Sequence, residues 1–316
     1  MQTKEKRSMC GKLVTVILPA YNEEDNIQRA SQTIAAVLEQ ENINYELLFV
    51  NDGSKDDTWE KILAESSKNS RVRGVSFSKN FGKESAIFAG LSEARGDCCA
   101  VMDTDLQHPP EKLVEMYRLW QQGAEVVEGV KASRGKESAA HSFAAKCFYR
   151  LISRAVGIDM SRASDFKLLD RKAVNVLLTM REKHVFFRAL SSWIGFKTAE
   201  VEFEVADRAA GTTKWSTWSL VKYAVRNIAS FTSLPLQIIT FLGILVLIVS
   251  VVLGSIALYQ KAVHTALDGF TTVIVVLLFI GSIIMISLGC IGYYIAKIYD
   301  EIKGRPRYII SEKCGK

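Results

Sequence analysis

Two long uncharged segments in the last third of the sequence most constrain how this chain can fold. No Asp, Glu, Lys or Arg occurs between Arg226 and Lys261, or between Asp268 and Lys297. Each segment exceeds the roughly 20 apolar residues that a helix needs to cross a bilayer core of about 30 Å. Two buried helices of a large soluble core are the alternative, but such helices rarely stay uncharged over this length twice in succession. We therefore predict a hairpin of two transmembrane helices over residues 234–296, with the first span at about residues 234–259 and the second at about residues 270–296.

Basic residues beside these segments indicate which side of the membrane they face, because Lys and Arg are hard to translocate. They precede the first segment and follow the second, at Lys214, Lys222, Arg226, Lys297, Lys303, Arg305 and Arg307. The linker between the segments holds only Lys261. The N-terminus lacks the apolar stretch of a signal peptide. We expect both termini to be cytoplasmic, and the net charge of +6 needs no nucleic-acid partner.

Strand-like and helical patterns alternate in the cytosolic part, residues 1–213. Runs of β-branched and aromatic residues occur at residues 13–20, 45–52, 72–78, 98–105 and 125–130, and a further strand pattern occurs at residues 198–206. Helix-forming segments occur between them at residues 27–38, 83–95 and 110–122. This alternation predicts an α/β domain with a mostly parallel sheet covered on both faces. In such a sheet, ligands bind outside the carboxyl ends of the strands.

Two shorter segments complete the predicted organisation. Residues 214–233 combine an apolar helical face with basic residues, as in a helix that lies in the headgroup layer. A helix packed on the soluble domain is the alternative. Residues 297–316 are expected to form a cytosolic tail after the second transmembrane helix.

Acidic clusters follow three of the predicted strands and so meet at one edge of the sheet. They lie at residues 19–24, 51–57 and 103–108. Asp103 and Asp105 are separated by one residue at a strand end, so both carboxylates can face one cation. Such hard oxygen ligands suit Mg²⁺ or Mn²⁺ carrying a diphosphate. Gln107 adds a neutral oxygen close to the predicted metal.

Neighbouring side chains suit the rest of a nucleotide. Asp52 and Glu23 lie at adjacent strand ends, where they can accept hydrogen bonds from a base and a ribose. Lys83 opens a predicted helix whose N-terminus can face phosphate. Cations near a diphosphate stabilise the negative charge that builds up when it leaves. Arg208 and Lys214 can close over the donor, or they are simple juxtamembrane positive charge.

Five motifs resemble those of the family 2 glycosyltransferases, and in particular the polyprenyl-phosphate sugar transferases. This group includes bacterial bactoprenol glucosyltransferases and dolichyl-phosphate mannosyltransferases. The motifs lie at residues 19–23, 51–54, 80–84, 103–111 and 165–171, and the resemblance extends through both apolar segments. It implies a GT-A fold, a divalent metal and an inverting single displacement. The implied reaction moves a hexose from a nucleotide-diphosphate sugar to polyprenyl phosphate at a bacterial inner membrane.

The same resemblance implies roles for residues of the donor site. The metal and the diphosphate would be held by Asp103, Asp105 and Gln107. The nucleotide pocket would be formed by Pro19, Tyr21, Glu23, Asp52, Lys83 and Asp103. All of these positions except Pro19 and Tyr21 are also indicated by strand ends and side-chain chemistry.

On the acceptor side, Asp165 matches the acidic residue that the family assigns as catalytic base. A phosphate monoester has a second pKa of about 6 and is largely ionised at pH 7. Asp165 can therefore orient the acceptor or the sugar instead.

Basic residues of the acceptor side follow the family less closely. Lys131 and Arg134 occupy the region where relatives bind the lipid phosphate, and Arg208 with Lys214 resembles their mobile juxtamembrane loop. Lys131 and Lys167 stand where many relatives carry arginine, which keeps the charge but loses bidentate phosphate geometry.

Two other functions fit the sequence less well. A processive polysaccharide synthase would carry Gln-x-x-Arg-Trp, which residues 186–193 lack, and would need more than two spans to line a polymer channel. A non-catalytic nucleotide-sugar sensor would leave the acidic edge without a metal to neutralise it. UDP-glucose is the first expectation for the donor, with GDP-mannose, UDP-GlcNAc and UDP-aminoarabinose as alternatives. Paired spans of this family also suit assembly into a homo-oligomer.

Overall fold

The computed structural model describes residues 11–131, 163–180, 186–204 and 269–315, together with single positions between residues 239 and 263. The chain divides into two compact units, which are described separately. The first unit comprises residues 1–220 and 306–316, and the second comprises residues 221–305.

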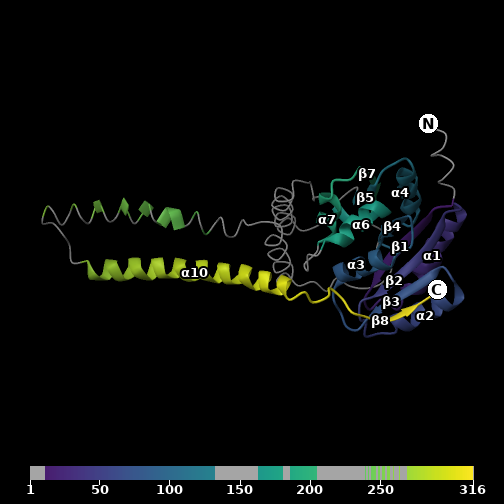
Figure 1. The fold of residues 1–316 in the computed structure, drawn as a ribbon, viewed down its shortest axis with the longest axis horizontal. Helices are drawn as coiled ribbons and strands as arrows, with labels where there is room; N and C mark the ends of the chain where they lie inside the picture. The colour runs from purple at the N-terminus through teal and green to yellow at the C-terminus, as the bar shows by residue number, and fades with distance from the viewer. Residues whose placement is uncertain are drawn as a thin grey trace. The chain divides into compact units, whose positions relative to one another are not determined.

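The first unit contains a mixed sheet of eight strands in the order β7-β5-β6-β4-β1-β2-β3-β8 (Figure 1). The strands are β1 (Leu13–Ala20), β2 (Asn44–Asn51), β3 (Val72–Phe77), β4 (Cys98–Val101), β5 (Val126–Lys131), β6 (Ala163–Asp170), β7 (Thr198–Phe203) and β8 (Ile310–Cys314). The central strands β4, β1, β2 and β3 are parallel, so their carboxyl ends meet at one edge. β6 pairs antiparallel with β4 and β5, and β8 pairs antiparallel with β3. The predicted α/β sheet is confirmed, but the sequence patterns predict neither β6 nor β8.

Helices cover both faces of the sheet, because successive residues of a strand point to opposite sides. The helices are α1 (Ile27–Gln40), α2 (Thr58–Lys68), α3 (Lys83–Glu93), α4 (Glu111–Gln121), α6 (Arg171–Thr179) and α7 (Phe187–Trp193). Val14, Val16 and Leu18 of β1 share a core with α1, α2 and α4. Ile17 faces the other way and meets Gly90 of α3, where an added Cβ would overlap the Ile17 side chain. This close approach sets the position of α3, whose first residue belongs to the site described below.

The second unit contains α10 (Phe270–Ile302). Its window Phe279–Ala296 has a mean hydropathy of 1.9, and within the described residues α10 is the one helix long and apolar enough to cross a membrane. It coincides with the second predicted span. The first predicted span, residues 234–259, is described only at scattered positions, so the two-helix hairpin remains a prediction.

Candidate functional site

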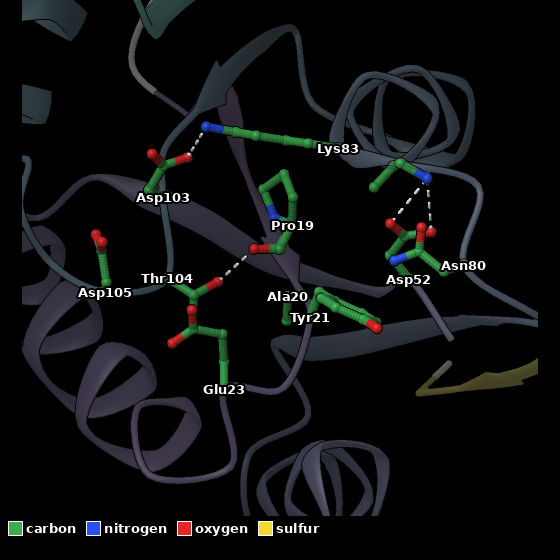
Figure 2. A pocket seen from close by; sticks show the side chains of 12 residues that line it. Pro19, Ala20, Tyr21, Glu23, Asp52, Asn80, Lys83, Asp103, Thr104 and Asp105 are labelled. Atoms are coloured by element: carbon green, nitrogen blue, oxygen red, sulfur yellow. Dashed lines mark hydrogen bonds and ion pairs between the residues drawn. The ribbon is translucent and has the colours of Figure 1, made fainter. Parts of the chain in front are cut away.

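A pocket of about 260 Å³ opens at the carboxyl ends of β1, β2 and β4 (Figure 2). It is lined by Pro19, Ala20, Tyr21, Glu23, Asp52, Asn80, Gly82, Lys83, Ala86, Asp103, Thr104 and Asp105. The structure therefore gathers most of the residues predicted for the donor site. Gln107 lies in the same turn as Asp105, to which its backbone N–H donates at 3.1 Å, but it does not line the pocket.

The loops after β1 and β2 are joined by hydrogen bonds that hold one wall of the pocket. Asn22 has a left-handed φ of 55°, which asparagine tolerates better than most residues. Its backbone N–H donates to Ser54 Oγ at 3.0 Å, and its side-chain oxygen accepts from the Lys55 N–H at 2.9 Å. The neighbouring Tyr21 is 42% exposed at the pocket and offers a ring for stacking.

Asp52 is buried where β2 ends and is fixed by the loop that follows β3. Its Oδ1 accepts from the Phe81 N–H at 2.7 Å, and its Oδ2 accepts from the Gly82 N–H at 2.9 Å. Burial raises the pKa of the Asp52 carboxyl, although these two backbone donors oppose the shift. Each carboxylate oxygen has a second lone pair. Asp52 can therefore accept a further hydrogen bond from a ligand in the pocket.

The acidic motif after β4 forms a turn, because β4 ends at Val101 and not at residue 105 as the sequence predicts. Leu106 has a left-handed φ of 57°, and Thr104 Oγ1 donates to the Pro19 carbonyl at 2.8 Å. This turn places both Asp103 and Asp105 along the pocket (Figure 2).

The two carboxylates fit a divalent cation that arrives with a diphosphate. Among the described residues there is no cluster of three or more His, Cys, Asp or Glu side chains that could hold a metal by itself. Mg²⁺ is usually bound by one or two carboxylates together with waters and substrate phosphates. Asp103 and Asp105 line one pocket and supply such a pair.

Lys83 joins the predicted metal-binding motif to the predicted acceptor side. Its ammonium lies 2.6 Å from Asp103 Oδ1 and 2.9 Å from Asp165 Oδ2. Burial would lower the pKa of Lys83, but the two carboxylates raise it above its usual value. Lys83 therefore stays protonated and holds a positive charge between Asp103 and Asp165.

Arg188 of α7 grips Asp165 with two hydrogen bonds, a contact that the sequence analysis missed. Arg188 Nε lies 2.6 Å from Asp165 Oδ1, and a terminal nitrogen donates to Oδ2 at 2.9 Å. Burial opposes ionisation of Asp165, yet the neighbouring Lys83 and Arg188 cations hold the pKa of its carboxyl well below its usual value. In the sequence, Arg188 is a lone arginine within residues 186–193, and its spacing does not indicate a contact with Asp165.

Lys167 has a structural role, although the sequence analysis places it among the basic residues of the acceptor side. Its side chain has no exposed surface, and its ammonium lies 2.6 Å from Glu128 Oε1 and 3.0 Å from Ser192 Oγ. Ser192 also donates to Glu128 at 2.6 Å. Because Ser192 belongs to α7, this buried network fastens α7 to β5 and β6 and so supports Arg188.

Glu84 holds the first turn of α7. Its Oε2 accepts from the Phe187 N–H at 2.9 Å, and burial raises the pKa of the Glu84 carboxyl to about 7. Lys131, in contrast, is exposed at the end of β5. The remaining predicted acceptor residues, Arg134, Arg208 and Lys214, lie outside the described residues, as does the juxtamembrane segment 214–233.

The comparison with known families decides the classification. Residues 15–178 match the family described as glycosyl transferase family 2. The chain belongs to this family. This family 2 glycosyltransferase is 37% identical to an uncharacterised glycosyltransferase of Synechocystis, and the match covers 96% of each chain. It is also 36% identical to a prophage bactoprenol glucosyl transferase homologue of Escherichia coli, over 94% of this chain and 98% of the relative.

Solved structures support the GT-A-like fold of this family 2 glycosyltransferase. Mannosyl-3-phosphoglycerate synthase of Rubrobacter xylanophilus matches with a TM-score of 0.50 at 18% identity, covering 72% of this chain and 75% of that one. Glucosyl-3-phosphoglycerate synthase of Mycobacterium tuberculosis, in complex with Mn²⁺, UDP and phosphoglyceric acid, also matches with a TM-score of 0.50 at 18% identity. It covers 72% of this chain and 80% of the synthase. At this identity the likeness concerns the fold.

Proposed function

We propose that this chain transfers glucose from UDP-glucose to a polyprenyl phosphate at the cytoplasmic face of a bacterial inner membrane. One observation carries the proposal: the chain is similar over almost its full length to proteins named bactoprenol glucosyl transferase, at 36% and 34% identity over 94% and 95% of the chain. That similarity includes the apolar C-terminal third as well as the α/β domain. The Mn²⁺ and UDP bound by the mycobacterial synthase agree with a divalent metal and a uridine nucleotide.

The pocket supplies groups for each part of such a donor. Asp52 and Glu23 accept hydrogen bonds from the nucleoside, and Tyr21 and Pro19 lie against it. Asp103 and Asp105, with Gln107 beside them, hold Mg²⁺ or Mn²⁺. When bound, that ion neutralises the diphosphate and stabilises the charge that develops as UDP leaves. Lys83 adds a second positive charge next to the departing phosphate.

Transfer proceeds by a single displacement with inversion. An oxygen of the acceptor phosphate forms a bond to the anomeric carbon while the bond from that carbon to the β-phosphate oxygen breaks, and the electron pair leaves with UDP. Asp165 is a weak base because Lys83 and Arg188 lower its pKa. The acceptor phosphate is already largely ionised at pH 7. We therefore give Asp165 the role of orienting Lys83 and Arg188.

Further basic residues complete the proposed acceptor side. The residues that we assign to the lipid phosphate are Lys131, which is exposed at the end of β5, and Arg134. Arg208 and Lys214 are assigned to the acceptor phosphate and the diphosphate of the donor.

A physical argument from the C-terminus supports the proposed membrane hairpin. β8 follows α10 in the sequence, yet it pairs with β3, which precedes the membrane segments. Both strands must lie on the same side of the membrane, so the chain between them crosses an even number of times. With α10 as one crossing, a second is required, and residues 234–259 are the proposed one. The proposed organisation is therefore a catalytic domain at 1–213, a juxtamembrane segment at 214–233, a hairpin at 234–296 and a cytosolic tail at 297–316.

The decisive experiment incubates the purified full chain in detergent with polyprenyl phosphate, Mg²⁺ or Mn²⁺, and a panel of radiolabelled nucleotide sugars. We expect label to move into the lipid phase from UDP-glucose and to require the metal. If label moves from GDP-mannose, UDP-GlcNAc or UDP-aminoarabinose instead, that nucleotide sugar is the donor and the assignment of UDP-glucose is wrong. If the chain binds nucleotide but transfers no sugar, the proposed enzyme function is wrong and the chain is a nucleotide-sugar sensor.

A further inference from the structure

The segment that follows α10 returns to the edge of the catalytic sheet and carries an aromatic residue against it. Within this segment, residues 306–315, β8 pairs with β3 (Figure 1), and Ser78 N–H donates to the Ile309 carbonyl at 3.1 Å. Just before β8, the half-buried ring of Tyr308 stacks on Phe77, with centroids 5.1 Å apart and planes 11° apart. Phe77 is the last residue of β3 and is 3% exposed.

Phe77 also contacts the loop whose backbone N–H groups donate to Asp52. Its ring meets the ring of Phe81 edge-on, with centroids 5.7 Å apart and planes 87° apart. The backbone N–H of Phe81 donates to Asp52 Oδ1 at 2.7 Å. An unbroken series of contacts therefore leads from the C-terminal segment to a carboxylate of the pocket.

The same loop also lies against Gly53. This residue has a left-handed φ of 63°, and an added Cβ would lie 2.6 Å from the Asn80 nitrogen. Residues 79–82 therefore contact both the Asp52–Gly53 turn and, through the ring of Phe81, the ring of Phe77. Tyr308 is therefore coupled by ring contacts to the loop whose backbone donates to Asp52 and whose residues Asn80 and Gly82 line the pocket.

Arg307 keeps Tyr308 in place. Its guanidinium lies 4.8 Å from the ring centroid of Phe88 in α3, and it donates to the Met180 carbonyl. These contacts hold the segment before β8 on the same helix that begins with Lys83.

From this arrangement we infer that Tyr308 is a positioning residue for nucleotide binding. Through Phe77 and Phe81, its ring fixes the two backbone N–H groups that orient Asp52. The inference rests on the proposed function only in that the ligand of the pocket is a nucleotide. It assigns to the C-terminal segment a role in the donor site beyond closing the edge of the sheet.

The test compares Tyr308→Ala, Tyr308→Leu and Tyr308→Phe in the full chain in detergent. Titration calorimetry with UDP and Mn²⁺ measures binding, and hydrogen exchange without ligand measures protection of peptides covering residues 78–83. An aromatic pair contributes an amount that corresponds to a change of about three- to tenfold in a binding constant. We expect weaker UDP binding of that size and faster exchange in the Ala and Leu variants, with Tyr308→Phe close to wild type. The KM for the donor should rise while kcat at saturation stays within about twofold.

Lys313→Ala is the matched control, because Lys313 lies in the same segment but pairs with Glu93, at 2.7 Å, away from the aromatic contacts. It should bind UDP like wild type. Wild-type UDP affinity and exchange in Tyr308→Ala and Tyr308→Leu would overturn the inference, as would equal acceleration of exchange throughout the domain. Failure of the wild-type chain to bind any nucleotide would instead overturn the proposed function, while exchange at residues 78–83 would still report on Tyr308.

Discussion

Replacing Arg188 by Met tests how much the hydrogen bonds between Arg188 and Asp165 stabilise the catalytic domain. The substitution keeps an unbranched side chain of similar length but removes both hydrogen bonds to the carboxylate, at 2.6 and 2.9 Å. Asp165 would then keep the contact with Lys83 at 2.9 Å. The carboxylate would remain in a site where its side chain is 8% exposed.

The expected cost follows from that burial. Removing one partner of a fully buried ion pair costs about 3–5 kcal/mol. Arg188 is 28% exposed and Lys83 still neutralises Asp165, so the loss should be nearer the cost of hydrogen bonds to a charged group, about 2 kcal/mol. For a domain of this size class, about 2–4 °C of Tm is lost per kcal/mol. We therefore expect Arg188→Met to lower the Tm by about 4–8 °C.

A double-mutant cycle separates this interaction from a general loss of packing. Thermal unfolding is measured for Arg188→Met, Asp165→Asn and the double variant in the same detergent. If the two side chains stabilise the fold through each other, the double variant should lose little more than the larger single loss. Losses that add would refute the reasoning. Arg118→Met is the matched control, since Arg118 forms an exposed pair with Glu41 and its loss should cost less than about 1 kcal/mol.

Four further predictions address the site and its supports. Asp105→Ala should abolish metal-dependent transfer in the lipid-labelling assay, because it removes one of two carboxylates from the pocket. Gly53→Ala should lower the Tm by the equivalent of about 1–2 kcal/mol or more, because residue 53 has a left-handed φ of 63° and no room for a Cβ. Lys167→Met should cost about 3 kcal/mol by leaving Glu128 without its buried cation, and adding Glu128→Gln should restore part of the loss. Since the pKa of Glu84 is raised to about 7, the folded protein retains a proton that the unfolded chain releases at lower pH, so the Tm should fall as pH rises from about 5 to 7, and less so in Glu84→Gln.

Each of these predictions has an outcome that contradicts it. Metal-dependent turnover of Asp105→Ala at the wild-type rate would remove that residue from the metal site, and Glu111→Ala, at an exposed carboxylate nearby, is its control. An unchanged Tm in Gly53→Ala would mean that the loop after β3 can move away from the added Cβ without a loss of stability. A Lys167→Met loss that Glu128→Gln deepens would show that the two side chains act separately. A Glu84→Gln variant with the wild-type pH dependence would assign that dependence to another group.

Local patterns in the sequence were sufficient to predict the central part of the catalytic domain. The apolar spacing of Ile27, Ala30, Ile34, Val37 and Leu38 predicted α1, and all of them except the partly buried Val37 are buried in it. Short β-branched runs predicted β1, β2 and β3 within one or two residues of their bounds. Parallel strands end at a common edge, and so the positions of Asp52, Asp103 and Asp105 along the chain were enough to place them at one pocket.

Tertiary structure decided the contacts between residues far apart in the sequence. β8 joins β3 across more than 230 residues, and the periodicity of a five-residue segment carries no information about such a partner. In the same way, Lys167 and Arg188 are each a single cation flanked by apolar residues when read as sequence. Folding buries Lys167 beside Glu128 and leaves Arg188 partly exposed on Asp165. The sequence thus determined which chemical groups gather at the strand ends, because that depends on local order. Which cation supports the fold and which faces the site was decided by packing, because burial and pairing exist only once distant elements are in contact.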